Sequence, residues 1–316
     1  MSFLGSFSRR KFIYGTTCSI CGTLILPSCA EVPFTNRQQL NFYKYNLPIV
    51  TIQGHFAGYP VPKIYANENS LNKEVEKSYK KFISNAKENK ILIENTVDSK
   101  KIVEIGTEIS QSIEKFYIKT NDLNPVKDFN WEFALVDAKD KEGNLIKNAW
   151  CMPGGKIAFY TGIIPVAKND DGIASIMGHE IAHAFARHTV EKLTQASMIQ
   201  WTTEALSVSQ YSNILQKNVN LPGININIYG SLVNFGILLP FSRNMESEAD
   251  YMGLIFMNLS GFDMHESIQL WKRMQIANKA GSPPQFMSSH PSPENRITKL
   301  KEWIPTVKLQ YPPISV

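Results

Sequence analysis

Cysteine is scarce in this chain of 316 residues, with four in total. Cys18 and Cys21 lie in an N-terminal segment that we expect to be removed, and Cys29 would then become the first residue and carry a lipid. Cys151 is left as the single free thiol, so we expect no internal disulfide even in an oxidising compartment. Because the sequence places no activating base near it, we expect Cys151 to be a packed apolar residue and not a nucleophile.

The chain also lacks a strong charge imbalance and a long apolar run. Removal of residues 1–28 takes away Arg9, Arg10 and Lys11 and no acid, so the formal charge falls from +5 to +2. A near-neutral chain has no electrostatic basis for binding nucleic acid. The apolar stretch 224–239 is shorter than the ~20 residues of a bilayer-spanning helix, so we expect it to be a buried core segment.

The first 28 residues have the layout of a bacterial export signal. Two arginines and a lysine precede an apolar run over residues 12–26, which resembles a twin-arginine signal. Residues 26–29 read Leu-Pro-Ser-Cys and resemble a lipobox, with Cys29 as the acceptor of the lipid. The alternative is a retained anchor, but the run is too short and contains threonine, serine and glycine. We therefore expect a periplasmic protein held on a membrane by its lipid, and Ala30 favours the outer membrane.

His179, Glu180 and His183 form the HExxH pattern within a segment that reads as one helix. Positions i and i+4 lie on one face of a helix, so both imidazoles can bind the same zinc ion. Glu180 then faces the open coordination position, where it can take a proton from water. We expect Asp170 or Asp171 to cap the start of this helix.

A second helical segment supplies a candidate third ligand. Glu246 and Asp250 are four residues apart and are followed by an apolar helical pattern. Two neutral imidazoles and one carboxylate leave the fourth tetrahedral position for water, which is the arrangement of a catalytic zinc site. The sequence therefore predicts one Zn²⁺ per chain, bound by His179, His183 and Glu246.

Strand patterns fill residues 130–161, directly before the HExxH helix. An exposed edge strand of the expected small antiparallel sheet can pair with an extended polypeptide substrate by β-addition. A purely structural hairpin is the alternative, and the spacing does not distinguish the two. The candidate substrate-binding residues are Pro153, Gly154, Gly155, Lys156, Ile157 and Ala158.

With these motifs the chain resembles the CAAX-prenyl-endopeptidase type of HExxH metallopeptidase, and most closely its soluble bacterial periplasmic lipoprotein branch. The resemblance covers residues 130–304 and rests on Asn148, Ala149, Pro153, Gly154, Gly155, the segment 178–188, Ser242, Arg243, Glu246, Ala249, Asp250, Gly253, His290, Pro291 and Arg296. It implies zinc as the metal and Glu180 as the general base. It further implies that Asp250 orients a ligand histidine and that His290 and Arg296 stabilise the transition state.

The expected fold is α+β and mainly helical, a zincin of the gluzincin type with a small antiparallel sheet next to the HExxH helix. Residues 29–69 are expected to form a tether and irregular segments, since they show little periodicity. A single metalloprotease domain is expected over residues 70–310, with amphipathic helices at 70–121 and the catalytic core at 130–304. The multi-pass membrane body of the prenyl proteases is absent, so prenylated substrates are not implied.

The predicted function is zinc-dependent endoproteolysis of misfolded or unassembled envelope proteins. A zinc-stabilised chaperone is the alternative, against which the intact Glu180 argues, and an aminopeptidase would need an amine-binding acid that the sequence does not identify. His290 has a second possible role, because it could bind zinc directly and hold the enzyme latent. His55 and His265 lack metal-like spacing, and we expect His188 to be a cation at the end of its helix, so none of the three is an expected ligand.

Overall fold

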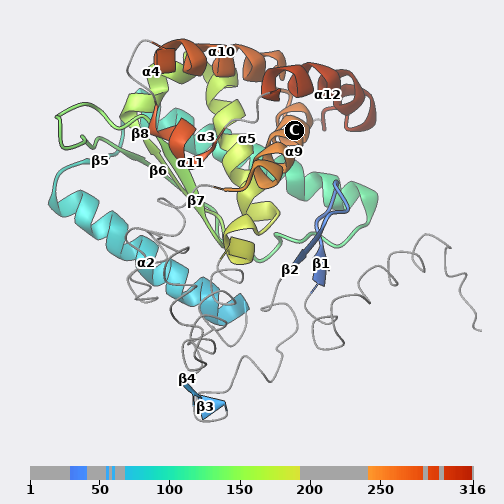
Figure 1. Cartoon of the computed structure of the whole chain (residues 1–316), viewed down its shortest axis with the longest axis horizontal. Coiled ribbons are helices and arrows are strands. Elements are labelled where there is room, and N and C mark those ends of the chain that lie inside the picture. Colours follow the sequence, from blue (N-terminus) through green and yellow to red (C-terminus); the bar gives the residue numbers. More distant parts are fainter. Residues whose placement is uncertain are drawn as a thin grey trace, which may run out of the picture.

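Helices surround one four-stranded sheet in the computed structural model (Figure 1). The structure describes residues 29–40, 55–56, 59–60, 68–192, 241–279, 284–291 and 295–314. The helices are α2 (Glu68–Glu88), α3 (Val97–Thr120), α4 (Ile164–Ala167), α5 (Asp170–Phe185), α9 (Arg243–Leu259), α10 (His265–Lys279), α11 (Gln285–Ser289) and α12 (Arg296–Gln310). The strands are β1 (Cys29–Glu31), β2 (Gln38–Leu40), β3 (His55–Phe56), β4 (Tyr59–Pro60), β5 (Leu92–Ile93), β6 (Glu132–Val136), β7 (Ala149–Met152) and β8 (Lys156–Tyr160).

The mainly helical α+β prediction is confirmed, including the two amphipathic helices before residue 121, which are α2 and α3. The apolar stretch 224–239, for which burial is predicted, lies outside the described residues. Among the residues that the structure does describe, no helix has both the length and the apolarity needed to cross a bilayer.

The sheet has the strand order β5-β6-β8-β7 and is mixed. β7 and β8 form the expected antiparallel hairpin, in which Cys151 lies opposite Ile157. β8 also pairs in parallel with β6, where Ile157 lies opposite Phe133. The expectation of a purely antiparallel sheet is therefore wrong. The turn residues of the hairpin specify only the β7–β8 pair, whereas the insertion of β8 beside β6 is a long-range contact.

The two faces of the sheet carry separate apolar clusters, because successive side chains of a strand point to opposite faces. Ala134 and Ala158 face α2, where they pack with its Leu71. Leu135 and Ile157 belong to the main core, which also contains the apolar residues of α3, α5 and α9. The sheet thus lies between α2 on one face and the layer of α3 and α5 on the other (Figure 1).

The helices α5 and α9 cross at a pair of glycines. A Cβ atom on Gly253 would lie 3.2 Å from the backbone nitrogen of His179, and one on Gly178 would lie 3.0 Å from the carbonyl oxygen of Gly253. Both distances are tighter than ordinary carbon contacts, so side chains here would separate the helices. The start of α5 is capped by Asn169, which accepts a hydrogen bond from Gly172 N, and not by either aspartate of the first turn as expected.

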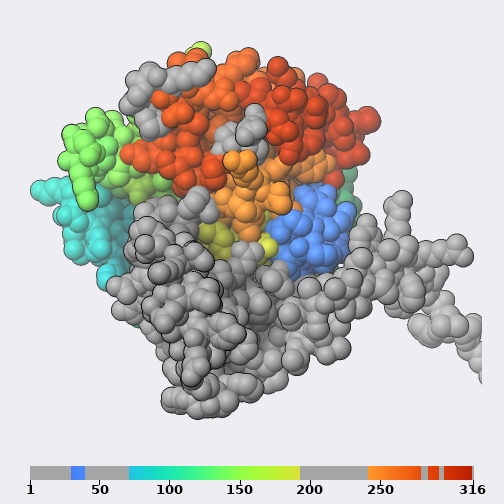
Figure 2. Space-filling model, viewed as in Figure 1, coloured from blue at the N-terminus to red at the C-terminus, as the bar shows by residue number. Residues whose placement is uncertain are grey.

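Residues 29–40 form a hairpin that packs onto the domain, in contrast to the irregular tether expected there. Val32 is fully buried, and the ring of Phe34 lies 5.5 Å from those of Phe116 and Phe185. Arg37 donates to the carboxylate of Glu248 on α9 over 2.6 Å. The hairpin therefore lies beside α9 at the surface of the domain (Figure 2).

Candidate metal centre

Four buried side chains from three parts of the chain converge beside the α5–α9 crossing. His179 Nε2 and His183 Nε2 of α5 are 3.0 Å apart. Each of these nitrogens is 3.4 Å from a carboxylate oxygen of Glu246 on α9. His290, which follows α11, places its Nδ1 3.2 Å from His179 Nε2 and 3.1 Å from Glu246 Oε1. The structure thus brings together the three predicted ligands and adds a fourth donor.

These separations fit a tetrahedral zinc ion. Ligand atoms at ~2.0–2.2 Å from a central zinc lie about 3.3–3.6 Å apart along the edges of the tetrahedron. The measured separations of 3.0–3.4 Å are close to this range. Two imidazole nitrogens and a carboxylate are also the donors that zinc prefers. The donor set and its spacing therefore fit the expected ion.

The electrostatics of the cluster favour a positive charge at its centre. Burial raises the pKa of Glu246, but the electrostatic effect of His290 and the contacts with His179 and His183 outweigh it and hold this pKa well below its usual value. Burial lowers the pKa of His179, but hydrogen bonds to Asp250 and Glu246 raise it overall to about 9. Burial keeps the pKa of His183 well below its ordinary value, as a neutral ligand requires.

Asp250 and Arg296 hold two members of the cluster in place. Asp250 Oδ1 lies 3.0 Å from His179 Nδ1, so it accepts the proton of that nitrogen and leaves the Nε2 lone pair facing the cluster. Arg296 donates to Asp250 over 2.5 Å and to Glu246 over 2.7 Å. Its guanidinium also lies over the ring of Trp271 at 3.8 Å. The geometry makes Arg296 an anchor for both carboxylates. Its Nη1 has no hydrogen-bond partner among the described residues, so its role as a donor to the transition state stays a prediction.

Glu180 is 1% exposed, and its Oε1 has no hydrogen-bond partner among the described residues. This oxygen lies 3.3 Å from His290 Nε2. Burial raises the pKa of Glu180 above its usual value, although the electrostatic effects of His290 and His179 oppose the shift. A buried carboxylate beside a metal-type cluster, with one oxygen left without a hydrogen bond, has the environment of a general base.

His188 is the residue that the sequence interpretation missed. It was expected to be a cation at a helix end, but α5 ends at Phe185 and the left-handed backbone of Arg187 (φ 55°) turns the chain back. His188 is fully buried, and its Nδ1 lies 2.8 Å from His183 Nδ1. Burial lowers its pKa, against the opposing effect of Glu248, so the charged form is disfavoured.

A chain of hydrogen bonds through His188 fixes the tautomer of His183. Glu248 Oε2 lies 2.9 Å from His188 Nε2 and accepts its proton, which leaves His188 Nδ1 as an acceptor. His183 Nδ1 then donates to His188, so the lone pair of His183 Nε2 faces the cluster. Thr35 and Arg37 of the N-terminal hairpin also bond to Glu248. The sequence did not predict the contact between His183 and His188, because residues five positions apart do not lie on one face of an α-helix.

The predicted substrate-binding segment does not lie on a free edge of the sheet. Lys156, Ile157 and Ala158 belong to β8, whose backbone already pairs with β6 and β7 on both sides. Lys156 is 3% exposed, and its Nζ donates to Glu132 over 2.6 Å. β-addition needs unpaired backbone groups, so the prediction is wrong for these three residues. The outer strand on this side is β7, where Cys151 is buried as expected.

We expect substitution of His188 by Phe to weaken zinc binding by about 10- to 100-fold, because His183 Nδ1–H loses its acceptor and the ring its orientation. Competition with a fluorescent zinc chelator measures the change. The same substitution at His265, which is exposed on α10, is the matched control and should leave the affinity unchanged. Equal affinities for the two variants would contradict the proposed orientation of His183.

Comparison with known proteins agrees with this site. The chain is 37% identical over 189 residues to the mitochondrial metalloendopeptidase OMA1 of Schizosaccharomyces pombe. The aligned region covers 60% of this chain and 51% of that protein. The OMA1 of Saccharomyces cerevisiae is 33% identical over 186 residues, or 57% and 49% of the two chains. The beta-barrel assembly-enhancing protease of Escherichia coli is 26% identical over 155 residues, or 48% and 31%. This chain spans about half the length of the two yeast relatives.

A model of peptidase family M48 matches residues 107–304. This range is more than half of the chain and contains the HExxH helix, α9, His290 and Arg296. On the strength of this match, the chain belongs to peptidase family M48.

Proposed function

We propose that the chain is a zinc-dependent metalloendopeptidase that hydrolyses peptide bonds within polypeptides. The observation that carries the proposal is the buried carboxylate of Glu180, whose Oε1 has no hydrogen-bond partner among the described residues, beside a cluster of zinc-type donors. His179, His183 and Glu246 would bind the metal, and Glu180 would be the general base. The assignment agrees with the names of the relatives, which are metalloendopeptidases and proteases.

Each residue of the site has a separate role in the proposed reaction. A zinc ion bound at the cluster would supply the Lewis acidity that activates water and polarises the scissile carbonyl. Glu180 Oε1 accepts a proton from the attacking water and delivers it to the leaving nitrogen. Its burial, which raises its pKa, makes it a better proton acceptor than an exposed carboxylate. Asp250, His188 and Arg296 keep the ligand side chains in place throughout.

The substrate class we propose is misfolded or unassembled protein of the bacterial envelope. Support comes from the E. coli relative, which is named a beta-barrel assembly-enhancing protease. We further propose that the chain belongs to a soluble branch resembling the CAAX-prenyl-endopeptidase type, on the motifs at 178–188, 242–253 and 290–296. The OMA1 relatives are named mitochondrial and do not support a bacterial location. The proposed location in the bacterial periplasm is therefore based on residues 8–29 of this sequence alone.

Attachment to a membrane through a lipid on Cys29 is part of the proposal. Cys29 begins β1, and the hairpin that follows packs against α9. A lipid at this position would therefore hold the catalytic domain close to the membrane surface, with no long tether between them.

In a bacterial host grown with radioactive palmitate, we expect wild-type protein to be labelled and to sediment with the membranes. Replacement of Cys29 by Ser should abolish the label, because the acceptor thiol is lost. Cys21→Ser is the matched control and should keep the label, since that residue is removed with the signal. Label on the Cys29→Ser protein would disprove the assignment.

Replacement of Glu180 by Gln should lower the rate of casein cleavage by about 10²- to 10⁴-fold, the range expected for loss of a general base. Zinc content, measured by mass spectrometry, should stay the same because the three ligands remain. Glu302→Gln on the exposed face of α12 is the control with unchanged activity. Undiminished cleavage would rule out the mechanism, and aggregation suppression without any cleavage in the wild type would favour the chaperone.

Replacement of His290 by Ala should raise the resting rate of casein cleavage. In the structure its Nδ1 completes the group of four donors while its Nε2 faces Glu180, so its ring fills the space that a reacting water needs. His265→Ala is the exposed control and should change nothing. A fall of about 10²-fold would instead show that His290 stabilises the transition state.

A further inference from the structure

Arg37 reaches from the N-terminal hairpin to a buried carboxylate of α9. Its Nε lies 2.6 Å from Glu248 Oε2, and its Nη2 lies 2.9 Å from Glu191 Oε2. Thr35 Oγ1 donates a hydrogen bond to the second oxygen of Glu248. Because Glu248 is 6% exposed, solvent can replace little of this bonding. Two side chains of the hairpin therefore fix the positions of both carboxylate oxygens.

The guanidinium of Arg37 is itself held in one place, because the hairpin is anchored in the core. Val32 is fully buried, and the ring of Phe34 lies 5.5 Å from that of Phe185. Val32 N donates to the carbonyl oxygen of Arg37 over 2.8 Å, which closes the turn. Gln39, which is also buried, accepts from the guanidinium over 3.4 Å. A planar group that is fixed at several nitrogens can orient an acceptor more firmly than a mobile side chain can.

The acceptor that Arg37 orients decides where His188 carries its proton. A neutral imidazole has one N–H, which can be on either ring nitrogen. Glu248 lies 2.9 Å from His188 Nε2 and holds the proton there, so Nδ1 can accept from His183 Nδ1 at 2.8 Å. With its proton on Nδ1, His188 would present a donor to His183 instead. The proton of His183 would then be on Nε2, the nitrogen that faces the cluster, and would block metal binding.

The family match gives no role to Arg37, which lies outside the matched residues 107–304. Its partners Glu248 and Glu191 are 211 and 154 positions away along the chain. In the described part of the chain, its side chain bonds to these two residues and to Gln39. Any effect of Arg37 on the candidate ligands is therefore transmitted by other side chains.

We propose that Arg37 is a positioning residue of the metal centre, which raises the affinity for zinc by fixing Glu248 and, through His188, the tautomer of His183. The inference rests on the proposed zinc-dependent function. It adds that the N-terminal hairpin, which lies outside the family match, is part of the metal site. The contribution of Arg37 is to keep a single arrangement of donors and acceptors along the side chains that lead to His183.

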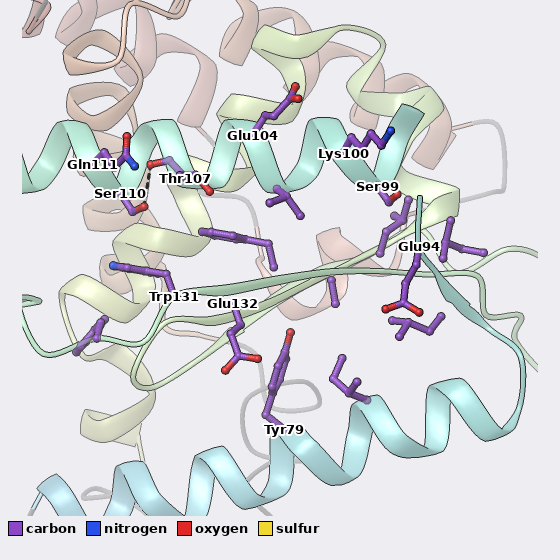
Figure 3. A pocket seen from close by; sticks show the side chains of 18 of the residues that line it. Tyr79, Glu94, Ser99, Lys100, Glu104, Thr107, Ser110, Gln111, Trp131 and Glu132 are labelled. Atoms are coloured by element: carbon purple, nitrogen blue, oxygen red, sulfur yellow. Dashed lines mark hydrogen bonds between the residues drawn. The ribbon is translucent and has the colours of Figure 1, made fainter. Parts of the chain in front are cut away.

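The first test is competition for zinc between the full chain and a fluorescent chelator. Arg37→Gln should weaken zinc binding about tenfold, the lower end of the range for groups that orient metal ligands. The matched control is Lys100→Gln, which removes the same charge from an exposed position of α3. Figure 3 shows Lys100 beside a groove of about 800 Å³, and the residues that line this groove include neither the metal cluster nor the partners of Arg37. Equal zinc affinity of the two variants would overturn the proposal.

The same measurement separates this inference from the proposed function. A wild-type protein that binds no zinc would overturn both. Tight binding by the wild type together with unchanged binding by Arg37→Gln would overturn only the role of Arg37.

A double-mutant cycle tests whether Arg37 acts through Glu248. Once Glu248→Gln has removed the carboxylate, adding Arg37→Gln should cause no further loss of zinc affinity. Both charges of the buried pair are absent from the double variant, so this comparison also serves if Arg37→Gln alone does not fold. A further loss in the double variant would overturn the proposal, because Arg37 would then act by another route.

Nitrogen NMR of the histidine rings distinguishes positioning from a general loss of stability. In the full chain before zinc is added, His188 should carry its proton on Nε2 alone in the wild type and on either nitrogen in Arg37→Gln. Val32→Ala is the control for hairpin stability, since it removes buried atoms of the hairpin but no group that bonds to Glu248, and it should keep the single tautomer. A single Nε2–H tautomer in Arg37→Gln, or the same mixture in Val32→Ala, would overturn the proposal.

Discussion

The close crossing of α5 and α9 at Gly178 and Gly253 is the constraint on which the rest of the site depends. Both glycines are packed against the backbone of the opposite helix, so the two helix axes approach more closely than larger residues would allow. One helix carries His179 and His183, and the other carries Glu246 and Asp250. Only at this short separation do carboxylates from α9 reach imidazoles on α5.

This contact also buries several carboxylates, whose desolvation is unfavourable, and a divalent cation at the cluster would stabilise them. Isolated charges cost several kcal/mol to bury, yet Glu180, Glu246 and Asp250 all lie inside the domain. Arg296 offsets part of the negative charge through its bonds to Glu246 and Asp250. A metal ion at the cluster would balance more of it, which is why the binding of the metal and the stability of the fold should be coupled.

The hydrogen-bond network extends the site beyond its ligands to the start of the described chain. His183 is linked through His188 to Glu248, and Glu248 is bonded by Thr35 and Arg37 of the N-terminal hairpin. The hairpin directly follows Cys29, the proposed point of membrane attachment. The N-terminal hairpin is thus connected to the candidate metal ligand His183 by three consecutive side-chain contacts.

Local spacing by itself was enough to predict three of the four donors that the structure brings together, His179, His183 and Glu246. HExxH and the Glu246–Asp250 pair are contained within single helices, where the helical period alone places the side chains on one face. The amphipathic helices α2 and α3 followed from the same periodicity. Only the tertiary structure decided the parallel β6–β8 pairing, the packed hairpin at residues 29–40, the anchoring role of Arg296 and the link from His188 to Glu248. Each of these depends on contacts between residues far apart in the chain or across an irregular turn, and the sequence of one segment carries no information on which distant backbone or side chain will meet it.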